Sequence, residues 1–138
     1  KEIIASGEMG KVLTFFSMFG HGGPESWSIE KSRNTWFFKK SSAAFGSMAD
    51  LGIHKIDLIR YLVGDEIADV YSRMCVLDKT FEDGTPIEVD DNSVEILKFR
   101  NGAFGTVTTS WTVYGTEFNQ NVICLEKGGL KHYSDTEY

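Results

Sequence analysis

Four side chains able to carry out acid–base chemistry are spaced along one stretch of the sequence, residues 46–64. They are Asp50, His54, Asp57 and Tyr61. In a helix that advances about 100° per residue, all four lie within roughly 40° of one line. A carboxylate one turn from an imidazole can bind a hydroxyl group and take its proton, because the pKa of histidine lies near neutral pH. The spacing therefore indicates a candidate site of proton transfer.

Each of these side chains also has a structural interpretation. Ser47 is predicted to cap the helix, and Asp50, three residues later, could complete a capping box. His54 could be a core histidine that is hydrogen-bonded to Asp57, and Tyr61 could pack with its hydroxyl group in water. A metal site with the spacing Asp-x3-His-x2-Asp is a further alternative, although the chain offers no obvious third or fourth ligand.

The helix that positions these residues is predicted to end at Gly64, where a left-handed glycine stops the helix. Seven apolar residues occupy most of its remaining circumference: Leu51, Ile53, Ile56, Leu58, Ile59, Leu62 and Val63. We therefore expect the helix to be buried on several sides.

Length and composition favour a single folded domain. A chain of 138 residues with 41% hydrophobic residues is long enough to form a real core. The net charge of −6 is spread along the chain, which argues against nucleic acid or an anionic membrane as a partner. We find no leader peptide and no apolar run near 18 residues, so neither secretion nor a membrane span is expected. Cys75 and Cys124 lie in apolar runs and are typical of core residues in a reducing compartment, the cytoplasm.

The rest of the chain is predicted to consist mainly of strands. These strands cover residues 11–19, 68–77, 94–100, 103–113, 121–126 and 130–133. Asn101-Gly102 and Lys127-Gly128-Gly129 provide tight hairpin turns, and the acidic segment 78–91 is expected to be a solvated hairpin tip or excursion. One helix followed by strands with short connections predicts an α+β fold, with an open, mainly antiparallel sheet and helix on one face.

A loop rich in aromatic residues, 20–40, joins the first predicted strand to the helix region. Its rings are Trp27, Trp36, Phe37 and Phe38, set among glycines and serines. Exposed aromatic surface usually marks a site or an interface, but these rings could also simply cover the sheet. His21 lies at the end of the preceding strand and is a candidate pocket residue.

The run Asp50-x-Gly52-x-His54-x2-Asp57 occurs together with shorter characteristic stretches at 6–12, 91–92, 99–105 and 128–130. Taken together, these stretches resemble the C-terminal domain of the Gfo/Idh/MocA oxidoreductases, the family of glucose–fructose oxidoreductase and inositol dehydrogenase. The resemblance implies the fold of the C-terminal domain of glyceraldehyde-3-phosphate-dehydrogenase-like oxidoreductases. It also implies that residues 1–138 form one substrate-binding and oligomerisation domain, without its N-terminal dinucleotide-binding Rossmann domain. The first residues resemble the end of a helix that closes at Gly7, which agrees with a piece of a longer protein.

In that family the residues matching Asp50 and His54 face the reactive carbon of a sugar or polyol. The resemblance implies that His54 takes the hydroxyl proton while hydride leaves for the nicotinamide, and that Asp50 holds the substrate. Asp57 would fix the imidazole tautomer, or have only a structural role. The expected substrate-binding residues are His21, Arg33, Asn34, Trp36 and Asp57; no residue is expected to bind a cofactor or a metal.

The implied function is substrate binding and dimerisation in an NAD(P)-dependent oxidoreductase that acts on the CH–OH group of a sugar or polyol. NAD or NADP would bind to the missing domain, which also carries the family's lysine near the nicotinamide, so this fragment alone is expected to be inactive. A homodimer or tetramer through the sheet is expected. Relatives often have three glycines where this chain has Ala44-Phe45-Gly46. This departure keeps open a non-catalytic binding or regulatory relative; a metal-dependent hydrolase or isomerase is a third alternative.

Overall fold

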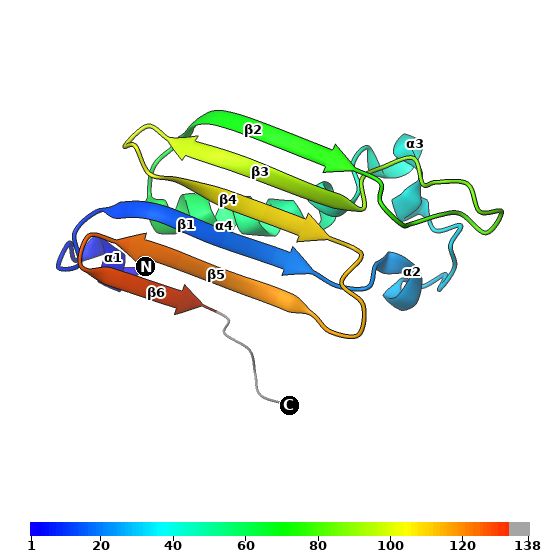
Figure 1. Ribbon diagram of the computed structural model, residues 1–138, viewed down its shortest axis with the longest axis horizontal. Coiled ribbons are helices and arrows are strands. Elements are labelled where there is room, and N and C mark those ends of the chain that lie inside the picture. Colours follow the sequence, from blue (N-terminus) through cyan, green and yellow to red (C-terminus); the bar gives the residue numbers. More distant parts are fainter. Residues whose placement is uncertain (133–138) are drawn as a thin grey trace.

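The computed structural model describes residues 1–132 and contains a six-stranded sheet with a helix across one face (Figure 1). The strands are β1 Val12–Gly20, β2 Ile67–Cys75, β3 Asn92–Phe99, β4 Phe104–Ser110, β5 Phe118–Leu125 and β6 Gly128–His132. Their order in the sheet is β2-β3-β4-β1-β5-β6. All neighbours are antiparallel except β1 and β4, which are parallel. The predicted α+β fold with an open, mainly antiparallel sheet is confirmed.

The helices divide into one that crosses the sheet and several short ones at its ends. Their bounds are α1 Glu2–Ala5, α2 Pro24–Trp27, η1 Trp36–Phe38, α3 Lys40–Ala43, η2 Met48–Gly52 and α4 Ile53–Val63. In Figure 1, α4 lies behind the sheet, and α2 and α3 gather at the end toward which β1 and β4 run. The loops that follow these two strands therefore meet the start of the central helix.

Two apolar clusters hold these layers together. Beneath α4, Ile59 packs on sheet residues that include Phe15, Phe99 and Val107. The second cluster lies at the end of the sheet and consists of Phe38, Leu51, Ile87, Val89 and Trp111. Burial of such side chains contributes about 1.5–3 kcal/mol each, so both clusters stabilise the position of the helix.

The central helix lies where it was predicted, but one side of it is open. It ends at Gly64 with a φ of +76°, as expected. Its first turn, η2, is π-helical, and turns of this kind often occur at functional sites. Ile53 is 61% exposed, and His54, Asp57 and Tyr61 are exposed beside it. The prediction that the helix is buried on several sides is therefore wrong for the described chain, because the side that carries Ile53, His54 and Asp57 is exposed.

The predicted capping box is also wrong. Ser47 has helical backbone angles and forms no side-chain capping bond; its hydroxyl group instead donates to Asp90 Oδ2 at 2.9 Å. The carboxylate of Asp90 accepts the backbone N–H groups of Gly46 and Met48, each at 2.8 Å. A residue far along the chain thus satisfies the free N–H groups at the helix start.

The segment 78–91 is exposed in its middle, but Lys79 near its start and residues 89–91 at its end are buried. Asp91 is fully buried, and its carboxylate accepts the backbone N–H groups of Leu77, Asp78 and Lys79 at 2.8–2.9 Å. Burial raises the pKa of Asp91, but these bonds and one from Asn92 outweigh it, so that the pKa is lowered overall. The prediction of a solvated excursion is wrong for these ends, because their acids are structural hydrogen-bond acceptors.

The predicted hairpins are confirmed. Asn101-Gly102 joins β3 to β4 with Gly102 at a φ of +91°, and a turn at Glu126-Lys127 joins β5 to β6, so Gly128 and Gly129 of the predicted turn already belong to β6. Residue 133 of the last predicted strand lies outside the described residues. Cys75 and Cys124 lie on β2 and β5, four strand spacings or about 19 Å apart, so they cannot pair within one chain. Over residues 1–132, the helices are all too short or too polar to cross a membrane.

Candidate functional site

Asp50 is held in a fixed position where η2 meets the end of β4. Its Oδ2 accepts a hydrogen bond of 3.1 Å from Nε1 of Trp111, a fully buried residue that follows β4 directly. The indole is itself fixed by the apolar cluster around Phe38. One carboxylate oxygen of Asp50 is therefore anchored, and the side chain stays only half-buried.

His54 and Asp57 lie further along the helix, on the exposed side of α4. His54 is four residues after Asp50, so its imidazole is accessible beside the anchored carboxylate. Within residues 1–132, no hydrogen bond joins His54 to Asp57. That Asp57 fixes the imidazole tautomer stays a prediction.

An unbroken series of ring contacts, which we call the aromatic row, lies beside Trp111, the residue that anchors Asp50. The row consists of Phe19, His21, Trp27, Phe37 and Trp36, with successive centroid distances of 5.9, 5.9, 5.2 and 4.0 Å. Phe37 also contacts Trp111 at 6.4 Å, which connects the row to Asp50. Trp36 forms the outer end, stacks on Phe37 and is 46% exposed. The predicted substrate residues His21 and Trp36 thus belong to the same surface as Asp50.

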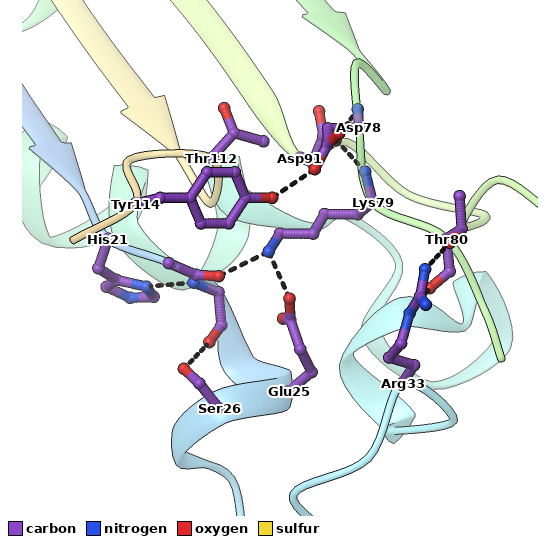
Figure 2. A network of polar contacts seen from close by, with 12 residues as sticks. His21, Glu25, Ser26, Arg33, Asp78, Lys79, Thr80, Asp91, Thr112 and Tyr114 are labelled. Carbon is purple, nitrogen blue, oxygen red and sulfur yellow. Dashed lines mark hydrogen bonds and ion pairs between the residues drawn. The ribbon is translucent and has the colours of Figure 1, made fainter. Parts of the chain in front are cut away.

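His21 is poised as a neutral imidazole. Its Nδ1 accepts the backbone N–H of Gly23 at 3.0 Å, so the proton of the neutral ring is on Nε2 (Figure 2). Burial lowers the pKa of His21, and the nearby carboxylates of Asp50, Glu117 and Glu25 oppose this shift. The influence of Asp50 on the pKa places the two side chains within electrostatic reach of each other.

Lys79 ties together the loops around His21, as Figure 2 shows. Its buried ammonium group donates to the carbonyl oxygen of Gly22 at 2.6 Å and to the carboxylate of Glu25. It also lies 4.6 Å from the ring centroid of Tyr114, whose hydroxyl group donates to Asp78. Burial and this hydrogen bond raise the pKa of Tyr114. Lys79 therefore fixes the segments that follow β1, β2 and β4 relative to one another.

Arg33 and Asn34 lie at the outer edge of this region. The Nε of Arg33 donates to the carbonyl oxygen of Thr80 at 3.0 Å, and a terminal nitrogen donates to the Thr80 hydroxyl group. Asn34 is exposed, and its backbone N–H donates to Ser32 Oγ at 3.0 Å. The Arg33 guanidinium thus holds the loop to segment 78–91, and a role of either residue in substrate binding stays a prediction.

The segment that enters η2 is sterically tight. Ala44 has a φ of +61° and a ψ of −50°, and the N–H of Phe45 donates to the carbonyl oxygen of Ala43 at 2.7 Å. This is a γ-turn of the strained kind, with a side chain at the position that favours glycine. A Cβ atom on Gly46 would lie 1.9 Å from the carbonyl oxygen of Asp90. The alanine at position 44 therefore strains the backbone just before the candidate catalytic residues.

Sequence reasoning missed three residues of this region: Trp111, Asp90 and Lys55. The partners of Trp111 and Asp90 are distant in sequence and left no local signal. Lys55 did leave one, because it lies four residues from both Leu51 and Ile59, on the most buried line of the helix. It is 3% exposed, and burial lowers its pKa to about 8 against the opposing charge of Glu117.

The arrangement is suited to binding a hydroxylated ring. An anchored carboxylate and an accessible imidazole can bind and deprotonate a hydroxyl group, and the aromatic row offers an apolar surface beside them. In the described part of the chain, no group of three His, Cys, Asp or Glu side chains could hold a metal ion. The metal-dependent alternative therefore finds no ligand set there.

Comparison with known proteins places this chain in a family. A model of the GFO/IDH/MocA C-terminal domain matches residues 1–131. The chain is 28% identical to the levoglucosan dehydrogenase of Pseudarthrobacter phenanthrenivorans, over 95% of this chain and 36% of that enzyme. It is 37% identical to the myo-inositol 2-dehydrogenase of Thermotoga maritima, over 51% of this chain and 21% of that enzyme.

The fold is also similar to solved structures of dehydrogenases and oxidoreductases. The crystal structure of GenD2 from gentamicin A biosynthesis, in complex with NAD, matches with a TM-score of 0.79 and 27% identity. The match covers 95% of this chain and 34% of GenD2, so the chain spans little more than a third of the length of its relatives. The chain belongs to the GFO/IDH/MocA C-terminal domain family, as the run Asp50-x-Gly52-x-His54-x2-Asp57 predicts.

Proposed function

We propose that this chain is the substrate-binding domain of a cytoplasmic, NAD- or NADP-dependent dehydrogenase that oxidises a CH–OH group of a sugar or polyol. The observation that carries the proposal is the hydrogen bond from the buried indole of Trp111 to Asp50. It fixes a carboxylate one turn before an accessible imidazole, next to exposed aromatic rings. The relatives support the chemistry, since their names state oxidation of levoglucosan and myo-inositol.

In this proposal His54 accepts the proton of the reacting hydroxyl group. Its exposed position on α4 lets it reach a substrate that lies on the helix, and an imidazole suits proton transfer near neutral pH. The half-buried oxygen of Asp50 accepts a hydrogen bond from the same or a neighbouring hydroxyl group, which holds the substrate in line. A nicotinamide held by a cofactor-carrying domain would supply the hydride acceptor.

The open side of α4 supports a second domain at this position. Ile53 and Tyr61 are large, exposed and apolar, and they flank His54 and Asp57 on the same side of the helix. Two large apolar side chains exposed beside candidate catalytic residues suit a surface that another domain covers. A cofactor-carrying domain seated there would bring the nicotinamide to His54, whereas the described chain itself offers no dinucleotide fingerprint.

The aromatic row supports a ring-shaped substrate. Trp36 and Trp27 are both about half exposed and lie in ring contact with Phe37. Exposed aromatic side chains beside hydrogen-bonding groups suit a pyranose or cyclitol, which has an apolar face and a polar rim. Levoglucosan and myo-inositol are substrates of this shape.

The test uses the complete protein that contains this domain, with NAD and NADP and a panel that includes levoglucosan and myo-inositol. We expect kcat to fall about 10²–10⁴-fold in His54→Ala, the usual effect of removing an acid–base group. In Asp50→Asn we expect kcat to fall about 10²-fold, because the substrate is no longer held in line. Lys98→Met removes an exposed lysine of β3 that the proposed site does not use; it is the control and should keep kcat within about twofold. Substrate oxidation at wild-type rates by both variants would refute the assignment.

We further propose that the sheet forms a homodimer or tetramer interface through its open face. This face exposes large apolar residues, among them Phe16 at 53%, Ile96 and Phe104. A shallow hollow of about 180 Å³ lies between Phe16, Thr106 and Val122. Phe16→Glu should shift the complete protein toward the monomer in analytical ultracentrifugation, whereas Ile29→Glu, outside the sheet, should not. A monomeric wild-type protein over a wide concentration range would count against the interface.

A further inference from the structure

Lys55 is a buried cation that the proposed reaction does not use. Its Nζ donates to Oδ1 of Asn119 at 2.6 Å and to Oδ1 of Asn121 at 3.1 Å, and it lies 5.4 Å from the ring centroid of Phe19. Burying a charge is costly unless hydrogen bonds compensate. A hydrophobic residue would satisfy packing at this position, so the ammonium group needs another explanation.

The two asparagines differ in what their NH₂ groups face. Oδ1 of Asn121 also accepts a bond of 2.6 Å from Ser17, and its Nδ2 lies 3.4 Å from Nδ1 of His132. The whole amide of Asn121 is thus used inside the fold. Asn119 is only half-buried, and over residues 1–132 its Nδ2 has no hydrogen-bond partner. Because Lys55 occupies Oδ1, the amide cannot flip, and the NH₂ group must point away from the lysine.

The amide of Asn119 lies next to the candidate site. In the β1–β5 ladder Asn119 is the partner of Phe19, which begins the aromatic row. Glu117, two residues earlier, raises the pKa of both Lys55 and His21, so it is within electrostatic reach of both. The free NH₂ group is therefore at the same end of the sheet as His21 and Asp50.

We propose that Asn119 is a substrate-binding residue whose NH₂ group donates to an acceptor oxygen of the sugar, and that Lys55 is the positioning residue that fixes its orientation. This inference rests on the proposed function and adds a specificity determinant to it. The acceptor would be a ring, acetal or hydroxyl oxygen on the part of the sugar that lies away from His54. Sugars that lack an oxygen there should gain nothing from Asn119.

The test measures kcat and KM in the complete protein, with the best sugar of the panel. Asn119→Ala and Lys55→Met should each raise KM about 3- to 10-fold, the effect of one lost hydrogen bond. The double variant should be no worse than the more affected single variant, because the lysine acts through the amide. The value of kcat should stay within about threefold, since Asp50 and His54 are intact.

The variant Asn119→Asp distinguishes a role of Asn119 in substrate binding from a role in the stability of the fold. A carboxylate still accepts the bond from Lys55 and keeps the fold, but it replaces the outward donor with an acceptor, so KM should rise while the melting temperature is unchanged or higher. Lys98→Met, which removes an exposed lysine from β3, is the control and should leave KM unchanged. An unchanged KM in Asn119→Asp overturns the inference, even if Lys55→Met fails to fold. If the wild-type protein oxidises no sugar, the proposed function fails first and this inference falls with it.

Discussion

Replacing Asp90 with alanine should both unfold the domain more easily and displace the candidate catalytic residues. Its carboxylate accepts hydrogen bonds from Gly46, Ser47 and Met48, which form the start of the helix that carries Asp50 and His54. Losing a capping side chain costs about 0.5–2 kcal/mol. A bond to a charged group contributes about 1.5–3 kcal/mol. Breaking a buried network of three such bonds should therefore lower the free energy of unfolding by about 3–5 kcal/mol.

Urea denaturation measures this loss in the free energy of unfolding. With a slope of about 2 kcal/mol per M, the midpoint of Asp90→Ala should fall by roughly 1.5–2.5 M relative to the wild-type protein. In the complete protein, kcat should also fall about 100-fold, because a displacement near 1 Å of Asp50 disturbs the geometry of attack. Asp90→Asn keeps one carbonyl acceptor, so its urea midpoint and its kcat should lie between those of the wild-type protein and Asp90→Ala.

The neighbouring residue provides the matched control. Asp91 also accepts three backbone bonds, but from Leu77, Asp78 and Lys79 rather than from the helix. Asp91→Ala should therefore lower the free energy of unfolding by a comparable amount. It should raise KM, because it disturbs the loop that holds His21, and should lower kcat less than Asp90→Ala does. The reasoning is refuted if Asp90→Ala is as stable as the wild-type protein, or if it loses stability while kcat is unchanged.

Three further predictions concern the start and the buried side of the same helix. Ala44→Gly should stabilise the protein by about 1 kcal/mol in urea, because Ala44 holds a strained positive φ; a destabilised variant would contradict this. Gly46→Ala should lower the melting temperature strongly, since its Cβ would lie 1.9 Å from the Asp90 carbonyl oxygen, and an unchanged value would refute the contact. The pKa of Lys55 is lowered from 10.5 to about 8, so over this range the unfolded chain binds more protons and the stability contributed by this group rises with pH. The free energy of unfolding of the wild-type protein should therefore rise by about 3 kcal/mol relative to that of Lys55→Met between about pH 8 and pH 10.5. A difference that does not change with pH would show that the pKa of Lys55 is not lowered.

Local signals in the sequence predicted most of the fold. Asn101-Gly102 specifies its hairpin and Gly64 ends the helix through backbone preferences that act within a few residues. The polar spacing from Asp50 to Asp57 likewise placed the candidate residues on one helix. These features do not depend on how distant segments pack.

The features that could not be predicted depend on long-range contacts. Asp90 lies 44 residues from Gly46, and Trp111 lies 61 residues from Asp50, so no local pattern identifies either partner. A serine before a helix normally caps it, but here the carboxylate of Asp90 accepts the N–H groups at the helix start, and Ser47 donates to the same carboxylate. Lys55 is different, because the i±4 pattern with Leu51 and Ile59 was visible in the sequence.

The most direct test of the proposed function is single-turnover reduction of enzyme-bound NAD in the complete protein, with saturating levoglucosan or myo-inositol. The wild-type protein should reduce the nicotinamide, and His54→Ala should do so about 10²–10⁴ times more slowly while sugar affinity changes less than about threefold. Equal rates in the two proteins, or no reduction by a wild-type protein that binds both NAD and the sugar, would contradict the proposal that this domain positions a sugar or polyol for oxidation.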